Sequence, residues 1–204
     1  ILYKQGLSYE NAKIWTSAIT FYEKAIDIAK DQDFYYLFLG RANMEQGKAA
    51  TGQERTEWLT ASEQALMQAR SIAPLNTDHS ANLARLYRTW GSLSSGQDKT
   101  DRLNKALANY EAATSLSPHN AQLFDEWGQT YAVLGDYDKA MEKYEQSLAL
   151  DSKYSQTYLL IGELAMQQKN WDEAKTTYEQ LIAISPKSAD AYAALGYVHT
   201  QMED

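Results

Sequence analysis

The 204-residue sequence contains no cysteine, only three prolines and ten glycines. The absence of cysteine excludes disulfides, thiol chemistry and cysteine-ligated zinc. Scarce proline and glycine disfavour a turn-rich β fold, whereas abundant alanine, leucine, glutamine, glutamate and lysine favour helix. No segment approaches the roughly 20 apolar residues that span a bilayer, and the first residues lack the basic-then-apolar order of a signal peptide. The sequence therefore predicts a helical domain, long enough to bury a core without a metal or disulfide.

Acidic residues outnumber basic ones, with 27 Asp and Glu against 19 Lys and Arg and a net charge of −8 at pH 7. This excess disfavours broad binding to nucleic acid or to an anionic membrane. A local basic patch is still compatible with this balance of charge.

Motifs for catalysis and for cofactor binding are also missing. The histidines at positions 79, 119 and 199 lack metal-ligand spacing, and there is no Gly-x-Ser-x-Gly, phosphate-loop or Gly-x-Gly-x-x-Gly sequence. Solvation and helix capping account for paired acids such as Asp172-Glu173. We therefore predict no enzymatic activity, cofactor or metal in this segment, and a surface or packing role for the histidines.

A pattern of glycine, alanine and aromatic residues recurs along the chain. Gly40, Gly128, Gly162 and Gly196 each follow an apolar residue and lie four residues after an aromatic one, and Gly6 shares this column. Twelve residues after the glycine of each short repeat comes an alanine, with a tyrosine four residues further on: Ala18 and Tyr22, Ala140 and Tyr144, Ala174 and Tyr178. The three prolines all fall at one repeat position: Pro74, Pro118 and Pro186.

This order, W-x2-L-G-x2-Y followed by A-x3-F and then P, resembles the tetratricopeptide repeat (TPR) family from end to end. The resemblance implies an all-α fold, a right-handed superhelical solenoid of antiparallel helix pairs with about five repeats and a terminal helix. Glycine and alanine permit close approach of helices, and the aromatic side chains fill the space around those contacts. One repeat cannot bury its own apolar face, so stacked repeats build the core.

The pattern predicts a single solenoid domain over residues 1–204, with repeats at 1–32, 33–76, 77–120, 121–154 and 155–188 and a partial repeat at 189–204. The predicted helices are 1–11, 15–29, 33–50, 54–72, 77–95, 99–116, 121–134, 137–150, 155–168, 171–184 and 189–202. Asp136 and Asp172 are expected to be N-caps, and Gly135 is expected to end a helix.

The second and third repeats each contain 44 residues instead of 34. Their extra residues are related, because the segment Gly52-Gln-Glu-Arg-Thr-Glu57 recurs as Gly96-Gln-Asp-Lys-Thr-Asp101. If the extra residues divide evenly, each helix of these repeats gains about five residues, or roughly 7.5 Å of rise. The long repeats should then project a ledge at 50–58 and 94–102, which is either a pair of solvated turns or a docking surface.

In the TPR family the first helix of each pair lines a concave groove. The resemblance places there Tyr3, Leu7, Glu10, Phe34, Leu37, Arg41, Met44, Asp78, Ala81, Arg85, Arg88, Gln122, Asp125, Gln129, Gln156, Leu159 and Glu163. Leu7, Leu37 and Ala81 stand where the TPR clamp for chaperone C-termini requires Lys and Asn, so recognition of chaperone tails is not expected.

Three of these groove residues are arginines in the two long repeats. Arg41 and Arg85 occupy the same repeat position, and Arg88 lies one helical turn beyond Arg85. Together with nearby apolar residues they could hold an acidic side chain, a C-terminal carboxylate or an anionic glycan by forked hydrogen bonds. The alternative is that Arg41 pairs with Glu45, and Arg85 with Asp78 or another acid, as ordinary surface ion pairs.

The leading prediction for function is a noncatalytic scaffold that binds a peptide or partner domain in the groove. The alternative rests on residues 33–42 and 74–87, which resemble the TPR tails of bacterial O-antigen ligase or polymerase membrane proteins. That resemblance implies an accessory domain in surface polysaccharide assembly, attached to an inner-membrane protein rather than free in the cytoplasm. We also expect the chain to be part of a longer one, with self-association possible through exposed solenoid ends.

Overall fold

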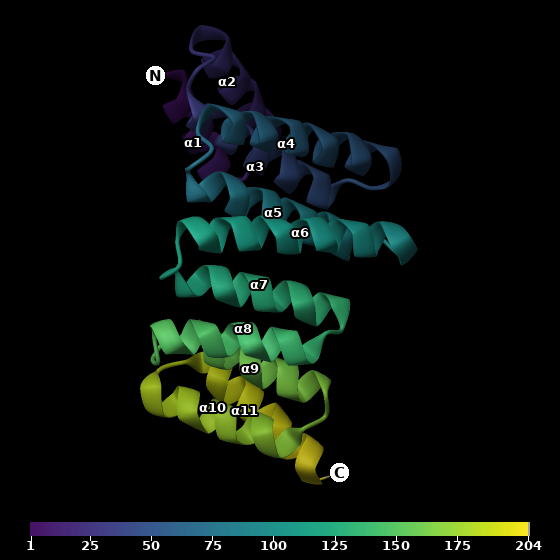
Figure 1. Cartoon of the computed structure of the whole chain (residues 1–204), viewed down its shortest axis with the longest axis vertical. Helices are drawn as coiled ribbons and strands as arrows, with labels where there is room; N and C mark the ends of the chain where they lie inside the picture. Colours follow the sequence, from purple (N-terminus) through teal and green to yellow (C-terminus); the bar gives the residue numbers. More distant parts are fainter. Residues whose placement is uncertain (204) are drawn as a thin grey trace. The chain divides into compact units, whose positions relative to one another are not determined.

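The computed structural model describes residues 1–203, and that part of the chain forms α-helices without a strand (Figure 1). The helices are α1 (Leu2–Asn11), α2 (Trp15–Ile28), α3 (Asp33–Ala49), α4 (Gly52–Ile72), α5 (Thr77–Ser92), α6 (Gly96–Leu116), α7 (Ala121–Leu134), α8 (Tyr137–Leu150), α9 (Ser155–Gln167), α10 (Trp171–Ile184) and α11 (Ala189–Glu203). The predicted all-α class and the predicted order of helices are confirmed.

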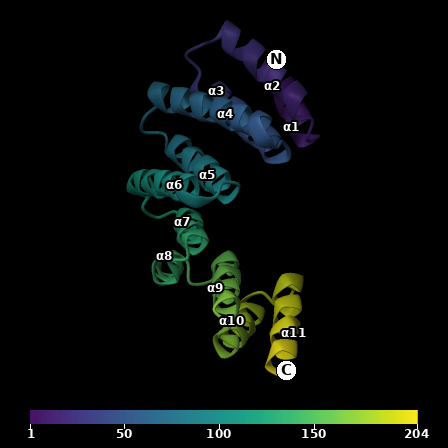
Figure 2. The ribbon, with the colours of Figure 1, turned by 90° about the vertical axis from the view of Figure 1, so that its right-hand side faces the viewer.

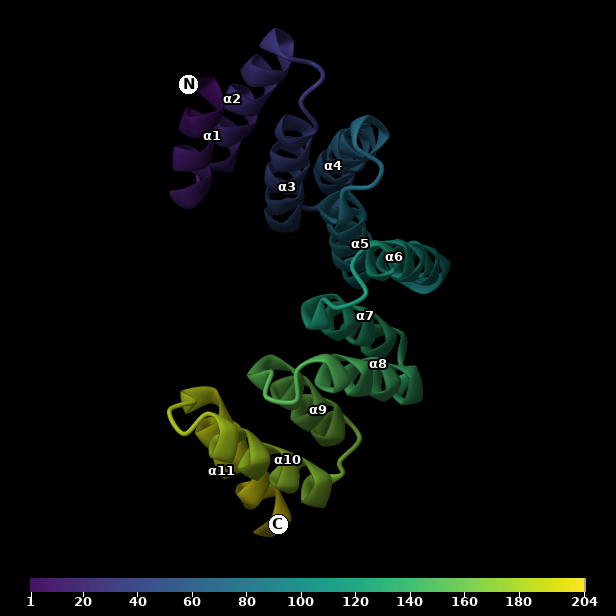
Figure 3. The same cartoon turned by 60° about the vertical axis from the view of Figure 1, so that its left-hand side comes forward.

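Contacts divide the chain into two compact units, Ile1–Ser117 (the N-terminal unit) and Pro118–Asp204 (the C-terminal unit). In the N-terminal unit each helix packs on its sequence neighbours, and α3 also contacts α5 (Figure 3). In the C-terminal unit α7 packs on α8 and α9, and α10 packs on both α9 and α11 (Figure 2). The single solenoid domain across 1–204 stays a prediction.

The repeated glycines lie where the two helices of a pair come closest. A β-carbon added to Gly128 would lie 2.5 Å from Cε1 of Tyr144, and Gly6 has the same relation to Tyr22. Real carbon atoms cannot approach so closely, so the tyrosine ring occupies the space that a larger residue would need. The glycine and tyrosine columns of the sequence therefore form one contact, repeated from pair to pair.

Ser62 replaces the usual alanine of this contact in the second repeat. Its hydroxyl, fully buried, donates a hydrogen bond of 2.7 Å to the carbonyl oxygen of Gly40. The serine in place of alanine thus forms a buried hydrogen bond between α3 and α4 where the two helices approach closely.

The extra residues of the long repeats do not divide evenly, so the expected five per helix is wrong. The second helices α4 and α6 each contain 21 residues against 14 in α8, while α3 and α5 contain 17 and 16 against 14 in α7. The added turns have their own buried contacts, because Gly47 lies against Leu59 and Gly91 against Leu103. A second small residue in each first helix thus allows the longer second helix to stay packed on it.

The two N-terminal turns of α4 and α6 are near copies. Thr51 and Ser95 precede the helices with φ and ψ of −134° and 163°, and of −135° and 166°, and the following Gly52 and Gly96 share a φ of +57°. One prediction about capping is wrong, because the side chain of Asn170, not of Asp172, accepts the hydrogen bond from an N–H group in the first turn of α10. The caps at Asp136 and Gly135 are confirmed.

Candidate peptide-binding pocket

A pocket of about 400 Å³ opens among the first helices of the N-terminal unit. Three first helices and the start of α2 line it: Glu10 on α1, Trp15 on α2, Leu37, Arg41, Met44 and Glu45 on α3, and Asp78, Asn82 and Arg85 on α5. The residues on α3 recur at spacings of three and four, which places them on one face of that helix. The pocket therefore combines an apolar wall with charged groups of both signs.

Arg41 is held in place by the neighbouring repeat. Its Nη2 atom donates to Oε1 of Glu10 over 2.7 Å, and its guanidinium carbon lies 5.6 Å from the ring centre of Phe38. Oε2 of Glu10 accepts a second hydrogen bond, of 2.5 Å, from the hydroxyl of buried Tyr22. Arg41 is therefore in an ion pair, as the alternative predicted, but its partner is Glu10 and not Glu45.

Glu45 pairs within its own helix instead. The Nζ atom of Lys48, three residues further on, lies 2.8 Å from the Glu45 carboxylate. The Glu10 carboxylate, in contrast, connects three helices, because it lies on α1 and accepts hydrogen bonds from Tyr22 on α2 and Arg41 on α3. Arg41 keeps a half-exposed side chain at the pocket despite this ion pair.

Six of the predicted groove residues come together in the pocket: Glu10, Leu37, Arg41, Met44, Asp78 and Arg85. Phe34 lies instead in an aromatic cluster, with its ring centre 5.4 Å from that of Tyr3 and 4.4 Å from that of Tyr35. Arg88 is half-buried on α5 and is not among the residues that line the pocket.

Three further predicted groove residues, Gln122, Asp125 and Gln129, lie on α7 in the C-terminal unit. Gln122 is exposed and donates a hydrogen bond of 2.8 Å to Glu126, and Gln129 is half-buried. Asp125 is only 2% exposed, so its placement on an open groove surface is wrong. Its carboxylate oxygens accept hydrogen bonds from the Thr157 hydroxyl at 2.9 and 3.0 Å.

The carboxyl of Asp125 is a buried acid without an ion pair among these contacts. Burial raises its pKa to about 6, against the opposing effect of hydrogen bonds from Ser147 and Thr157, and the negative charge of Glu126 raises the pKa further. Ser147 and Thr157 also lie within hydrogen-bonding distance of each other, at 2.9 Å. The group links α7, α8 and α9 inside the C-terminal unit rather than offering a binding surface.

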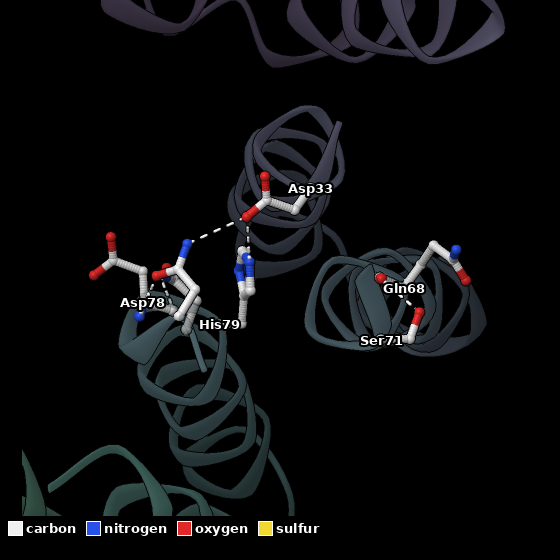
Figure 4. A network of polar contacts seen from close by, with 7 residues as sticks. Asp33, Gln68, Ser71, Asp78 and His79 are labelled. Atoms are coloured by element: carbon white, nitrogen blue, oxygen red, sulfur yellow. Dashed lines mark hydrogen bonds and ion pairs between the residues drawn. The ribbon is translucent and has the colours of Figure 1, made fainter. Parts of the chain in front are cut away.

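A second buried polar group joins α3 to α5 in the N-terminal unit. Nε2 of His79, which is fully buried, lies 2.7 Å from Oδ2 of Asp33 (Figure 4), and the Asn76 side chain donates to the same oxygen over 3.2 Å. Burial alone raises the pKa of Asp33, but the hydrogen bonds from His79 and Asn76 outweigh it and hold the pKa below its usual range. The packing role predicted for this histidine is confirmed.

Sequence reasoning missed three residues of the pocket: Trp15, Glu45 and Asn82. The recurrence of tryptophan at one repeat position predicts a core role for Trp15, and it does pack on the buried cluster around Tyr22 while also lining the pocket. Asn82 is 8% exposed, with its amide donating to the backbone oxygen of Asp78 over 2.8 Å. A polar side chain on a buried helix face is the signal that could have identified it.

Features of metal binding and of membrane spanning are absent from the described residues. Nowhere in residues 1–203 do three or more histidine or acidic side chains come together as metal ligands would. Within the same residues no helix has the length and apolar character required to cross a bilayer.

Comparisons with known proteins agree with this geometry. Family models described as tetratricopeptide repeat match residues 1–30, 98–155 and 134–198, and together these ranges cover more than half of the chain. No curated protein matches the sequence.

Several solved structures share the fold. A thermophilic TPR protein of Thermus thermophilus, TTC0263, is similar with a TM-score of 0.73 and 20% identity, over 98% of this chain and 97% of that one. The protein MamA is similar with a TM-score of 0.67 and 18% identity, over 90% and 96% of the two chains. A chain of the APC/C Cut9–Hcn1 hetero-tetramer reaches a TM-score of 0.67 at 18% identity, over 97% of this chain and 35% of its own. The repeated glycine–tyrosine contacts, the paired helices and these matches lead to one conclusion: the chain belongs to the tetratricopeptide repeat family.

Proposed function

We propose that the chain is a noncatalytic scaffold whose N-terminal unit binds an extended peptide of a partner protein. TPR proteins in general serve as protein-interaction scaffolds, and the fold presents first helices side by side as such binding requires. The proposal places the peptide in the pocket among α1, α3 and α5, where Arg41 and Arg85 hold an acidic side chain or a C-terminal carboxylate. Gln122 and Gln129 on α7 are proposed as further contacts that the C-terminal unit makes with the partner protein.

The observation that carries the proposal is the convergence of two equivalent arginines on one pocket. Arg41 and Arg85 come from different repeats, yet both line a space of about 400 Å³ together with Leu37 and Met44. A guanidinium is a rigid donor that binds carboxylates through two parallel hydrogen bonds. Leu37 and Met44 shield one side of such bonds from water, while the Arg41 side chain stays 44% exposed.

Calorimetric titration with synthetic peptides tests the proposal. An acidic peptide should bind the wild-type chain, and the Arg41→Ala/Arg85→Ala variant should lose that binding while circular dichroism shows unchanged helicity. A Lys4→Ala/Lys30→Ala variant removes the same charge from exposed positions outside the pocket and should bind normally. Equal binding by the wild type and the arginine variant would sink the proposal.

The segments that resemble O-antigen ligase tails have an explanation within the repeat. Residues 33–42 form the first part of α3, and residues 74–87 lead into α5, so both segments occupy the same repeat position. Packing of first helices accounts for an apolar residue that they share, Leu39 in one segment and Leu83 at the equivalent position of the other. The accessory role in polysaccharide assembly therefore remains the second proposal, and sequence upstream of Ile1 that encodes several membrane spans is the observation that would favour it.

A further inference from the structure

The charges around the pocket favour a ligand that has both an acidic and a basic group over a ligand that is only acidic or only basic. Its wall contains three carboxylates, Glu10, Glu45 and Asp78, and two guanidinium groups, Arg41 and Arg85. An acidic group that binds the arginines is repelled by the nearby carboxylates. A basic group that binds the carboxylates is repelled by the nearby arginines. A ligand with both charges, suitably spaced, gains from both sets of groups.

The three carboxylates differ in how they are engaged. Glu10 accepts hydrogen bonds from Arg41 and Tyr22, and Glu45 pairs with Lys48. Asp78 is exposed, and its bonds to Asn76 and Asn82 use only its backbone N–H and carbonyl groups. Asp78 is thus the carboxylate of this pocket that is best placed to meet a cation from outside.

Asp78 and Arg85 lie two turns apart on α5, which corresponds to about 10 Å of helical rise. Side chains at positions i and i+2 of an extended peptide project from one face and start about 7 Å apart. Flexible glutamate and lysine side chains cover the remaining distance. Leu37 lines the pocket between the level of the arginines and that of Asp78, and the aliphatic stem of a lysine or arginine can pack against it.

We propose that the pocket selects a peptide segment in which an acidic residue and a basic residue are two positions apart. The acidic group lies at Arg41 and Arg85, and the basic side chain extends past Leu37 to Asp78, toward the N-terminal ends of α3 and α5. This inference rests on the proposed peptide binding and adds to it the chemistry of the bound segment. Asp78 is then the residue that determines specificity for the basic side chain.

The experiment uses the full chain and four synthetic decapeptides that differ at two positions only: Glu-x-Lys, Glu-x-Gln, Gln-x-Lys and Gln-x-Gln. Calorimetry should rank Glu-x-Lys first, with an affinity about twofold to fivefold above that of Glu-x-Gln, as is usual for an exposed ion pair. Asp78→Asn should abolish this advantage of lysine over glutamine but keep the advantage of Glu-x-Gln over Gln-x-Gln. The control Asp27→Asn, an exposed acid on α2 outside the pocket, should change neither preference.

A second experiment reverses the charge at residue 78 and measures whether the peptide preference reverses with it. Asp78→Lys should prefer a Glu-x-Glu peptide over Glu-x-Lys, because the cation at residue 78 then meets an acid. Equal affinities of Glu-x-Lys and Glu-x-Gln for the wild type, or a lysine preference that survives in Asp78→Asn, would overturn the inference while peptide binding through the arginines stands. Failure of all four peptides to bind would overturn both.

Discussion

Gly162 and Gly196 occupy the same column of the repeat but have opposite surroundings. A β-carbon on Gly162 would lie 2.5 Å from Cε1 of Tyr178, whereas no such heavy atom lies within 4 Å of one on Gly196. The same residue at the same repeat position therefore has a packing role at Gly162 but not at Gly196. At position 162 the reason is space, and at position 196 only the cost of a glycine within a helix remains.

The two positions should respond to the same substitution with opposite signs. Gly162→Ala should lower the free energy of unfolding by about 1–3 kcal/mol, because the methyl group must displace the tyrosine ring. Gly196→Ala should raise it by up to about 1 kcal/mol through higher helix propensity. Urea denaturation followed by circular dichroism measures both, and two changes of the same sign would contradict this account of the column.

Asp125 should give the C-terminal unit an unusual dependence on pH. Its pKa of about 6 in the folded state lies above the value near 3.9 of an unfolded chain, so folding favours its protonated form. This stabilising contribution is present below pH 4 and is lost as the pH rises through 6, by at most about 3 kcal/mol. Asp33 has the opposite effect, because its pKa in the folded state is lowered. Its contribution to the free energy of unfolding is present at higher pH and is lost on acidification.

The Asp125→Asn variant isolates this contribution. Asparagine can still accept the hydrogen bond from Thr157 but carries no charge at any pH, so its stability relative to the wild type should increase between pH 4 and pH 7. Thermal unfolding at several pH values gives the difference. The control Asp138→Asn replaces an exposed acid of the same unit and should show no comparable trend. If the difference in stability between Asp125→Asn and the wild type did not change with pH, Asp125 would be ionised in the folded state.

The resemblance to the TPR family predicted the pocket only in part. It placed Leu37, Arg41, Met44 and Arg85 in the groove, and these four residues of α3 and α5 line the pocket. It could not show that Asp125 is buried, because the Thr157 hydroxyl that donates to its carboxylate belongs to α9, in the next repeat. Contacts between repeats depend on side chains far apart in sequence, and a single-repeat pattern does not contain them.

At the scale of the helices, turn geometry separates short repeats that look alike. The turn between α7 and α8 uses Gly135 with a φ of +83°, and the turn between α9 and α10 uses Lys169 with a φ of +57°. This left-handed region costs residues with a β-carbon roughly 1–2 kcal/mol, and glycine avoids that cost. The lysine turn therefore contains strain that the glycine turn lacks.

Exchanging these residues tests the strain directly. Lys169→Gly should stabilise the chain by up to about 1 kcal/mol, after allowance for the greater freedom of glycine in the unfolded state. Gly135→Ala should destabilise it by about 1 kcal/mol, since it introduces the same strain at the equivalent turn. The midpoints of chemical unfolding give both values, and a loss of stability in Lys169→Gly would mean that the lysine side chain has a compensating contact.

The helix bounds themselves were accessible from sequence, with the long repeats as the exception. Fixed spacing between equivalent residues located each pair, but the division of the extra residues between two helices was not encoded in that spacing. It depends on Gly47 and Gly91, each of which lets a leucine of the partner helix approach. A glycine within a long helix can have several explanations in sequence. Only the packing of α4 and α6 shows that these two glycines make room for a leucine of the partner helix.

At the scale of the whole molecule, repeats contact mainly their neighbours, so stability should be distributed locally. Gly162→Ala, which disturbs the contact of α9 with α10, should lower hydrogen-exchange protection in α9, α10 and α11 much more than in α1 to α4. Hydrogen exchange read by mass spectrometry on the variant and the wild type measures this. Equal loss of protection along the chain would show that the chain opens as one cooperative body.

The turns before α4 and α6 have nearly the same backbone angles, so the chain could pass from the first helix of one long repeat into the second helix of the other. A chain that passes from Thr51 directly to Gly96 would meet the same backbone angles that it meets at Gly52. Such a deletion removes one 44-residue repeat and lets the leucine of α6 that faces Gly91 face Gly47 instead. The N-terminal unit can therefore become shorter or longer by whole 44-residue repeats without the need for a new turn.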